Sequence, residues 1–154
     1  MLHRLKLVAV AVSILVPTLL GMAAGPEHSL PHKEHCVGTI TTYSDGAVTY
    51  TGEGTGTQLG RYTIVGGHEV DAEGNIFNGV FISTAADGST LHGMYTGSAA
   101  LVGNGVARSD LHVTWLGGTG RLQDVTGIGD VVCTHGITAG SAMEYSTIGT
   151  LIRP

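Results

Sequence analysis

Apolar and polar residues alternate in short runs along most of this chain, and no run after residue 36 has the apolar spacing of a helix. The runs are rich in β-branched and aromatic residues and end at Gly, Asp or Asn. Turn signals such as Ser44-Asp45-Gly46 and Gly103-Asn104-Gly105 separate them. The pattern predicts eight strands, at residues 37–43, 47–53, 59–70, 76–84, 90–97, 111–116, 124–134 and 143–152.

Eight strands with hairpin-length connections fit either an up-and-down antiparallel β-barrel or a sandwich. Glycine occurs inside the predicted strands as well as at their ends, which is typical of strands that bend to close a barrel. Residues 78–83 and 130–133 carry apolar side chains on both faces. We therefore expect an all-β, eight-stranded barrel whose outer wall packs in a homodimer or homotrimer, with a two-layered sandwich as the alternative.

The first residues have the features of a secretory signal peptide. Arg4 and Lys6 precede an apolar run from Leu7 to Leu20, and small residues follow it. The run is shorter than the roughly 20 residues of a membrane-spanning helix, although an uncleaved N-terminal anchor is an alternative. We predict a signal peptide at residues 1–24, a polar, flexible linker at residues 25–36 and the barrel at residues 37–154, in a secreted or periplasmic protein with no membrane span after cleavage.

The charge of the chain limits its partners. The formal net charge is −5, and the predicted signal peptide holds no acidic residue, so the remainder is more acidic still. An acidic domain with no cluster of Lys or Arg is not expected to bind nucleic acid.

Two cysteines, Cys36 and Cys133, lie at opposite ends of the predicted domain. In an exported protein this placement favours one disulfide, which would close a loop of about 100 residues and require the first strand and a late strand to be neighbours. Two free, buried thiols are the alternative.

Three segments carry a resemblance to a known family. They are Leu111-His-Val-Thr-Trp-Leu-Gly-Gly-Thr-Gly-Arg-Leu-Gln-Asp-Val-Thr-Gly-Ile-Gly-Asp130, Gly54-Thr-Gly-Thr-Gln-Leu-Gly-Arg-Tyr-Thr63 and Ala85-Ala-Asp-Gly-Ser-Thr-Leu91. The first resembles the strand, glycine turn and strand of the allene oxide cyclase barrel superfamily, which includes the dirigent-like proteins. The others are similar to motifs of its secreted bacterial members. The resemblance covers residues 46–152.

The resemblance implies a closed eight-stranded barrel with an apolar lumen, often in a dimer or trimer. It also implies binding of hydrophobic small molecules and control of their cyclisation or coupling, without a cofactor. The plant cyclases carry a Glu and an Asn on an early inward-facing strand. The corresponding segment here, Cys36-Val-Gly-Thr-Ile-Thr-Thr-Tyr43, has neither. The scaffold is therefore carried over and the catalytic residues are not.

Glu53 is the candidate catalytic residue, because it stands between glycines in a region with few carboxylates. Inside an apolar lumen, desolvation would raise its pKa and suit it to proton transfer. The alternative is a solvent-exposed place at the barrel rim. Arg61 could bind a ligand carboxylate or phosphate, or pair with a neighbouring acid as a structural residue.

Tyr50, Tyr62, Tyr95 and Trp115 are the large rings available to line a cavity, with plain core packing as the alternative. No metal site is predicted, since the histidines at positions 28, 32 and 35 lie in a proline-containing polar segment and no His-x-His or His-Glu-x-x-His motif occurs. The sequence thus predicts a small exported barrel that binds a hydrophobic ligand or has a structural role. A cofactor-free cyclase or isomerase is the alternative.

Overall fold

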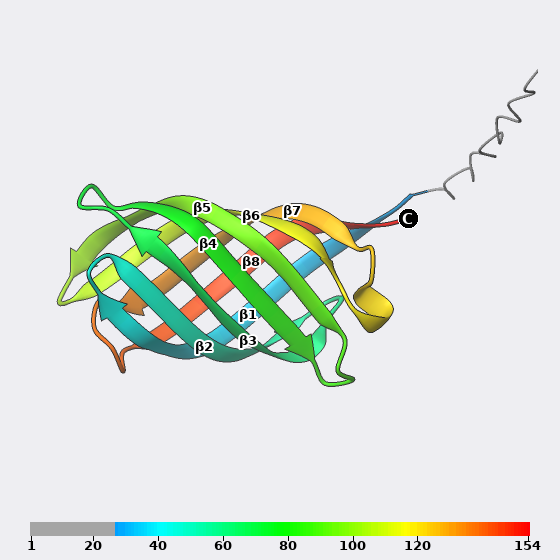
Figure 1. Cartoon of the computed structure of the whole chain (residues 1–154), viewed down its shortest axis with the longest axis horizontal. Coiled ribbons are helices and arrows are strands. Elements are labelled where there is room, and N and C mark those ends of the chain that lie inside the picture. Colours follow the sequence, from blue (N-terminus) through cyan, green and yellow to red (C-terminus); the bar gives the residue numbers. More distant parts are fainter. Residues whose placement is uncertain (1–26) are drawn as a thin grey trace, which may run out of the picture.

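The computed structural model describes residues 27–154, which form one closed antiparallel barrel. Its strands are β1 (His28–Ser44), β2 (Ala47–Gly56), β3 (Gly60–Val70), β4 (Asn75–Ala85), β5 (Thr90–Gly103), β6 (Val106–Gly118), β7 (Thr126–Gly136) and β8 (Ala142–Arg153). Each strand pairs with the next, and β8 pairs with β1 to close the sheet, as Figure 1 shows for the blue and red strands. The predicted up-and-down barrel is confirmed, and the sandwich is not formed.

The predicted linker at residues 25–36 is wrong, because most of it belongs to the first strand. Residues 28–35 belong to β1, which pairs with β8 from His28↔Arg153 onward. Pro31 is compatible with the strand because β2 pairs with β1 only from Glu34 onward, so the N–H that proline lacks is not needed by that ladder. Alternate residues from Leu30 to Cys36 point inward, so a segment that is polar in composition still follows the two-residue period of a strand. The predicted signal peptide, residues 1–24, lies outside the described residues.

Large side chains line the lumen and lie over glycines of neighbouring strands. A Cβ atom added to Gly129 would lie 2.8 Å from the Trp115 ring, and one added to Gly149 would lie 2.9 Å from it. Four other rings lie over a glycine in the same way: Tyr62 over Gly54, Tyr50 over Gly66, Tyr95 over Gly79 and Phe81 over Gly93. An eight-stranded barrel is just wide enough for its side chains to fill. The inward glycines therefore make room for rings in a narrow interior.

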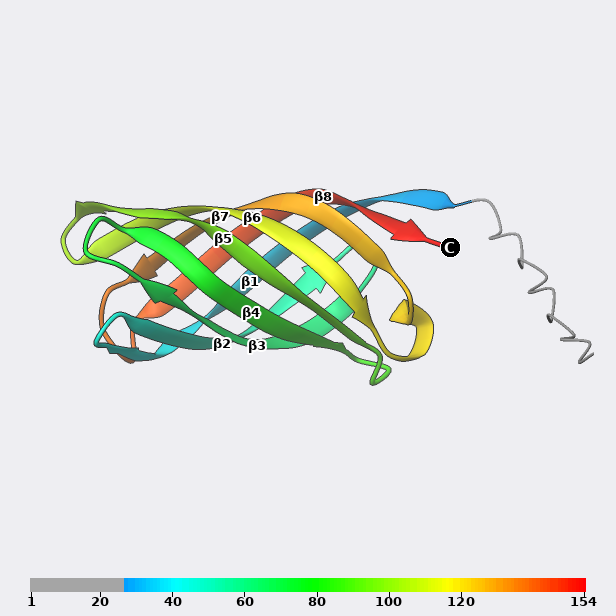
Figure 2. The same cartoon turned by 45° about the horizontal axis from the view of Figure 1, so that its top comes forward.

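The two ends of the barrel differ. The end where β1 begins and β8 ends also carries the β6–β7 loop with its single turn of 3-10 helix, Gly120–Leu122 (Figure 2). Fully buried Leu59, Leu122 and Val125 pack there. Arg121 joins three loops at this end: it donates to the carbonyl oxygens of Gln58 and Leu59, and its Nε lies 2.7 Å from a carboxylate oxygen of Asp87.

Hairpin turns close the opposite end. Asp45 and Gly46 both have positive φ, at 51° and 77°, which is the conformation of a two-residue turn that matches the twist of antiparallel strands. The sequence predicted this turn at the correct position.

Candidate functional site

A cavity lies inside the barrel and is lined mainly by apolar side chains. The volume open to the centre of a water molecule is about 50 Å³. This is several times the volume that one water molecule needs. Polar groups interrupt the apolar wall at Glu34, His68, Ser109, His135 and Thr147. The cavity can therefore hold a small molecule and offer it hydrogen bonds.

Glu34 supplies the only carboxylate of this wall. It is 8% exposed and projects inward from β1. His32, two residues earlier on the same strand and fully buried, places Nε2 2.6 Å from Glu34 Oε1. The second carboxylate oxygen lies 3.3 Å from the Tyr62 hydroxyl and 3.5 Å from that of Tyr145. A buried carboxylate needs such partners, because without them its desolvation is very costly.

The two tyrosines of this cluster are hydrogen-bond donors at neutral pH. Burial, and then the charge of Glu34, raise the pKa of Tyr62 and of Tyr145 well above the ordinary value for tyrosine. Their hydroxyl oxygens are 2.9 Å apart, so one hydroxyl donates to the other. The network therefore presents one carboxylate with a fixed set of neutral donors around it.

His32 also contacts the indole ring of Trp115, edge to face, with ring centroids 5.1 Å apart. His32 Nδ1 and Trp115 Nε1 are both buried without a hydrogen-bond partner among residues 27–154. Buried polar atoms are normally paired, so these two atoms mark the polar end of the cavity, beside Glu34, as a place where a bound molecule or water can add hydrogen bonds.

A second polar cluster involves β3, β5, β6 and β7. His68 Nδ1 lies 2.9 Å from the Tyr95 hydroxyl, and Ser109 Oγ lies 3.1 Å from His135 Nε2. Burial, followed by the charge of His135, lowers the pKa of His68 to about 4. His68 is therefore uncharged at neutral pH.

Three of the six site candidates from the sequence line the cavity. Tyr62 is buried beside Glu34 but is not part of the cavity wall. Tyr50, Tyr95 and Trp115 project into the cavity from β2, β5 and β6. Glu53 and Arg61 do not, because both occupy outward positions of their strands and are exposed. Glu53 follows the inward-facing Gly52, so the alternation of the strand places its carboxylate on the outer wall. The desolvation required for its predicted proton-transfer role is absent.

The predicted disulfide is wrong. Within residues 27–154 both Cys36 and Cys133 are free and buried. Cys36 pairs with Tyr145 of β8, and Tyr145 pairs in turn with Cys133 of β7. One strand thus separates the cysteines, and their Cα atoms lie about two strand spacings, roughly 9–10 Å, apart. A disulfide needs about 4.4–6.8 Å. Barrel closure makes β8, and not β7, the neighbour of β1.

Sequence reasoning missed most of the residues that carry the polar chemistry of the lumen: His32, Glu34, His68, Ser109, His135, Tyr145 and Thr147. His32 and Glu34 fall in the predicted linker. The alternation of Leu30, His32, Glu34 and Cys36 in register with Ile40 was the signal that could have found them. The other residues needed the barrel, since they lie on four separate strands, β3, β6, β7 and β8.

Comparisons with known proteins do not assign this site. A scan against protein-family models, a search of curated proteins and a search of solved structures each found no significant match. Among residues 27–154, no group of three or more His, Cys, Asp and Glu side chains is arranged to hold a metal ion. In the same part of the chain, no helix has the length and apolarity needed to cross a membrane.

Proposed function

We propose that the barrel binds a small, largely apolar molecule in its lumen, with a hydrogen-bonding group of that molecule directed at Glu34. The observation that carries this proposal is the cavity itself, whose apolar wall surrounds a few buried polar groups. Such a composition is typical of small-molecule sites. Apolar burial supplies the affinity, and the carboxylate selects a ligand that donates a hydrogen bond.

The chemistry of the cluster defines the preferred ligand. Glu34 accepts hydrogen bonds and repels anions, while the neighbouring tyrosine hydroxyls already face its second oxygen. The series toluene, benzyl alcohol and benzoate keeps the ring and changes only the polar group. By calorimetry, benzyl alcohol should bind more tightly than benzoate. Equal affinity for all three would show that Glu34 does not contact the ligand.

A pair of adjacent valines gives a matched test of the location. Val131 lines the cavity, whereas Val132 is 40% exposed on the outer wall. Val131→Phe should fill the lumen and abolish binding, and Val132→Phe should leave it unchanged, with circular dichroism showing that both variants are folded. Retained binding in Val131→Phe would place the site elsewhere. Native mass spectrometry of protein purified from its own host would then identify the natural ligand.

A cyclase or isomerase is the second candidate, and the buried Glu34 carboxylate is the observation that favours it. A carboxylate surrounded by imidazole and phenol groups can accept a proton from a bound substrate and return it. The substrate conformation would be set by the shape of the cavity. For any substrate found, Glu34→Gln should retain binding and lose turnover by at least about 100-fold. Unchanged turnover would remove the enzymatic role of Glu34.

We also propose that the barrel belongs to the allene oxide cyclase-like superfamily. The glycine-turn motifs and the eight-stranded antiparallel barrel both support this assignment. The basic, then apolar, start of the chain supports export through a signal peptide. The mass of the protein secreted by its host, compared with that of the full chain, tests the cleavage.

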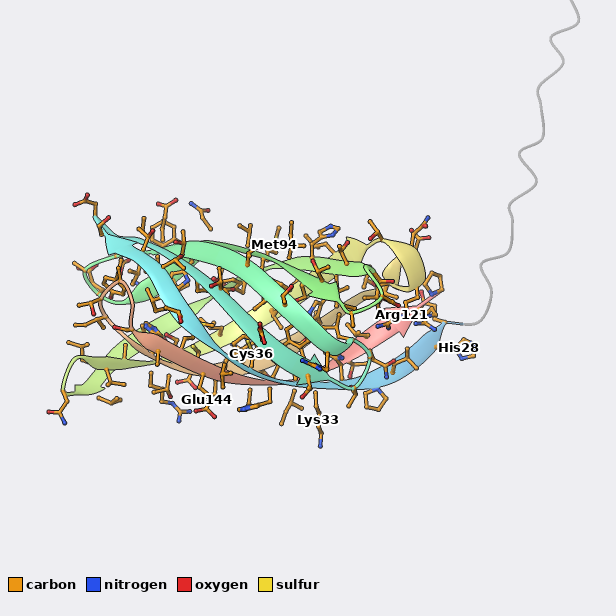
Figure 3. The ribbon with its side chains drawn as sticks, turned by 90° about the horizontal axis from the view of Figure 1, so that it is seen from below. His28, Lys33, Cys36, Met94, Arg121 and Glu144 are labelled. Atoms are coloured by element: carbon orange, nitrogen blue, oxygen red, sulfur yellow. The ribbon has the colours of Figure 1, made fainter. Side chains whose placement is uncertain are left out.

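The outer wall supports self-association. Val65, Val80, Ile82 and Met94 are 49–58% exposed on β3, β4 and β5. Val65 pairs with Ile82, and Val80 with Met94, so the four side chains form one patch, which we call the β3–β5 patch. Figure 3 shows Met94 on the outer surface. We propose that a second copy of the chain covers this patch in a dimer or trimer.

A further inference from the structure

Ser109 and His135 form a hydrogen-bonded pair on the inner wall of the barrel. Ser109 lies on β6 and His135 on β7, and they are diagonal neighbours because Ser109 pairs with Cys133 and His135 with Ala107. Ser109 Oγ is 3.1 Å from His135 Nε2. The two residues are 2% and 5% exposed, and both line the cavity. A serine and a histidine thus meet where a bound molecule would lie.

The second ring nitrogen of His135 sets the direction of this hydrogen bond. His135 Nδ1 lies 3.0 Å from the carbonyl oxygen of Gly136. A carbonyl oxygen only accepts, so Nδ1 carries the proton. In the neutral ring Nε2 then holds a lone pair, and the Ser109 hydroxyl donates to it. A nucleophile, a base within about 3 Å and a third group that orients the base make up the arrangement typical of covalent catalysis.

The surroundings of this pair supply neutral hydrogen-bond donors. Burial raises the pKa of Tyr50 and Tyr95 well above the ordinary tyrosine value, so both are protonated donors on the same cavity wall. His68 is likewise uncharged at neutral pH, as described above. Neutral O–H and N–H groups in a dry site are the kind that stabilise a developing oxyanion.

Ser83 shows that the pairing of Ser109 is not general among the inner serines. Ser83 is 1% exposed and faces inward from β4, yet its hydroxyl has no hydrogen-bond partner in the described part of the chain. It does not line the cavity. Ser83 is therefore a natural control for burial without a base.

We propose that Ser109 is a nucleophile that His135 activates toward a small ester bound in the lumen. The Ser109 oxygen attacks the ester carbonyl carbon, and its proton passes to His135 Nε2. The bond from the acyl carbon to the alcohol oxygen breaks, and the leaving alcohol takes the proton from His135. Water then attacks the acyl-Ser109 ester, with His135 as base, and releases a carboxylic acid and free Ser109.

The size and polarity of the cavity define the class of substrate. The cavity is small and mainly apolar, so the ester must have a small, apolar acyl or alcohol part. This inference rests on the proposed binding of small apolar molecules in the lumen. It adds a reaction and a second polar site, on β6 and β7, to that proposal.

The test uses the full folded protein and phenylmethanesulfonyl fluoride, which is small and has an apolar ring. Attack by Ser109 forms a sulfur–oxygen bond and expels fluoride. Intact mass should show a single adduct, and peptide mass mapping should locate it on Ser109 and not on Ser83. His135→Gln keeps a hydrogen-bonding side chain but removes the base, and it should slow labelling at least about 100-fold. Ser83→Ala should label at the rate of the unsubstituted protein.

Hydrolysis of p-nitrophenyl acetate by the same proteins gives the second readout. It should be lost in Ser109→Ala and His135→Gln and retained in Ser83→Ala. Absence of an adduct, an adduct on another residue, or labelling that does not depend on His135 overturns the proposal. Benzyl alcohol binding, measured in parallel, shows which proposal has failed: binding without labelling refutes the nucleophile alone, and loss of both refutes lumen binding as well.

Discussion

Replacing Gly129 with alanine tests whether the inward glycines exist to accommodate large rings. The added Cβ atom would lie 2.8 Å from Trp115 Cη2, 2.8 Å from the Ile148 carbonyl oxygen and 3.0 Å from Gly149 Cα. Ordinary carbon contacts lie at about 3.5–4.0 Å, so the indole ring must move by roughly 0.7 Å or more. Trp115 is 1% exposed and also lies over Gly149, which limits that movement.

Overpacking of this kind costs about 1–3 kcal/mol. Loss of glycine from the unfolded chain returns about 0.4–1 kcal/mol, so we expect a net loss of about 1–2 kcal/mol in the free energy of unfolding. Urea denaturation followed by circular dichroism measures it. Because Trp115 is the only tryptophan, its fluorescence should also change. Gly60→Ala is the control, since a Cβ atom there meets nothing within 4 Å and only the positive φ of 69° opposes it.

A double-mutant cycle separates the ring from the backbone contacts. Trp115→Phe removes the far edge of the indole, so Gly129→Ala should cost about 1 kcal/mol less in that background than with tryptophan present. The carbonyl of Ile148 remains, and part of the cost remains with it. If the free-energy costs of the two substitutions add to within about 0.3–0.5 kcal/mol, residues 115 and 129 are not coupled. The space opposite Gly129 would then not be reserved for Trp115.

The remaining predictions concern thiols, pH and assembly. Cys36 and Cys133 should both be alkylated after denaturation without reductant and resist alkylation in the native state, because burial raises their pKa to about 11 and about 12; an oxidised mass would contradict the free thiols. The lowered pKa of His68 means that the unfolded state binds the proton first, so stability should be complete above about pH 6.5 and fall by up to about 3 kcal/mol toward pH 4. This loss of stability should be smaller in His68→Gln and unchanged in His92→Gln, a substitution at an exposed histidine. Identical stability profiles against pH for the unsubstituted protein and both variants would show that His68 is not the cause. Met94→Lys should reduce the mass found by analytical ultracentrifugation to that of a single chain if the β3–β5 patch is an interface, and an unchanged assembly would show that it is not.

Local pattern was sufficient to find the turns of this protein and the central part of most of its strands. Strands are recognised by the alternation of apolar and polar side chains, and turns by Asp-Gly and Asn-Gly pairs. Both signals involve residues within about ten positions of one another, so they can be identified from the sequence alone. The eight strands follow from them, and the barrel follows from glycines placed inside strands. The prediction was wrong at the start of the first strand, because the polar composition of residues 28–35 concealed their two-residue alternation.

The lumen depended on tertiary structure. Whether Glu53 or Glu34 faces inward is decided by the phase of each strand, which pairing and closure set together. The separation of Cys36 from Cys133 follows from the single strand that closes the sheet between them. Ser109 and His135 lie 26 residues apart in sequence and 3.1 Å apart in space. Sequence determined which faces the strands could bury, and only the closed sheet brought these side chains together, because their proximity arises from cross-strand register and not from local spacing.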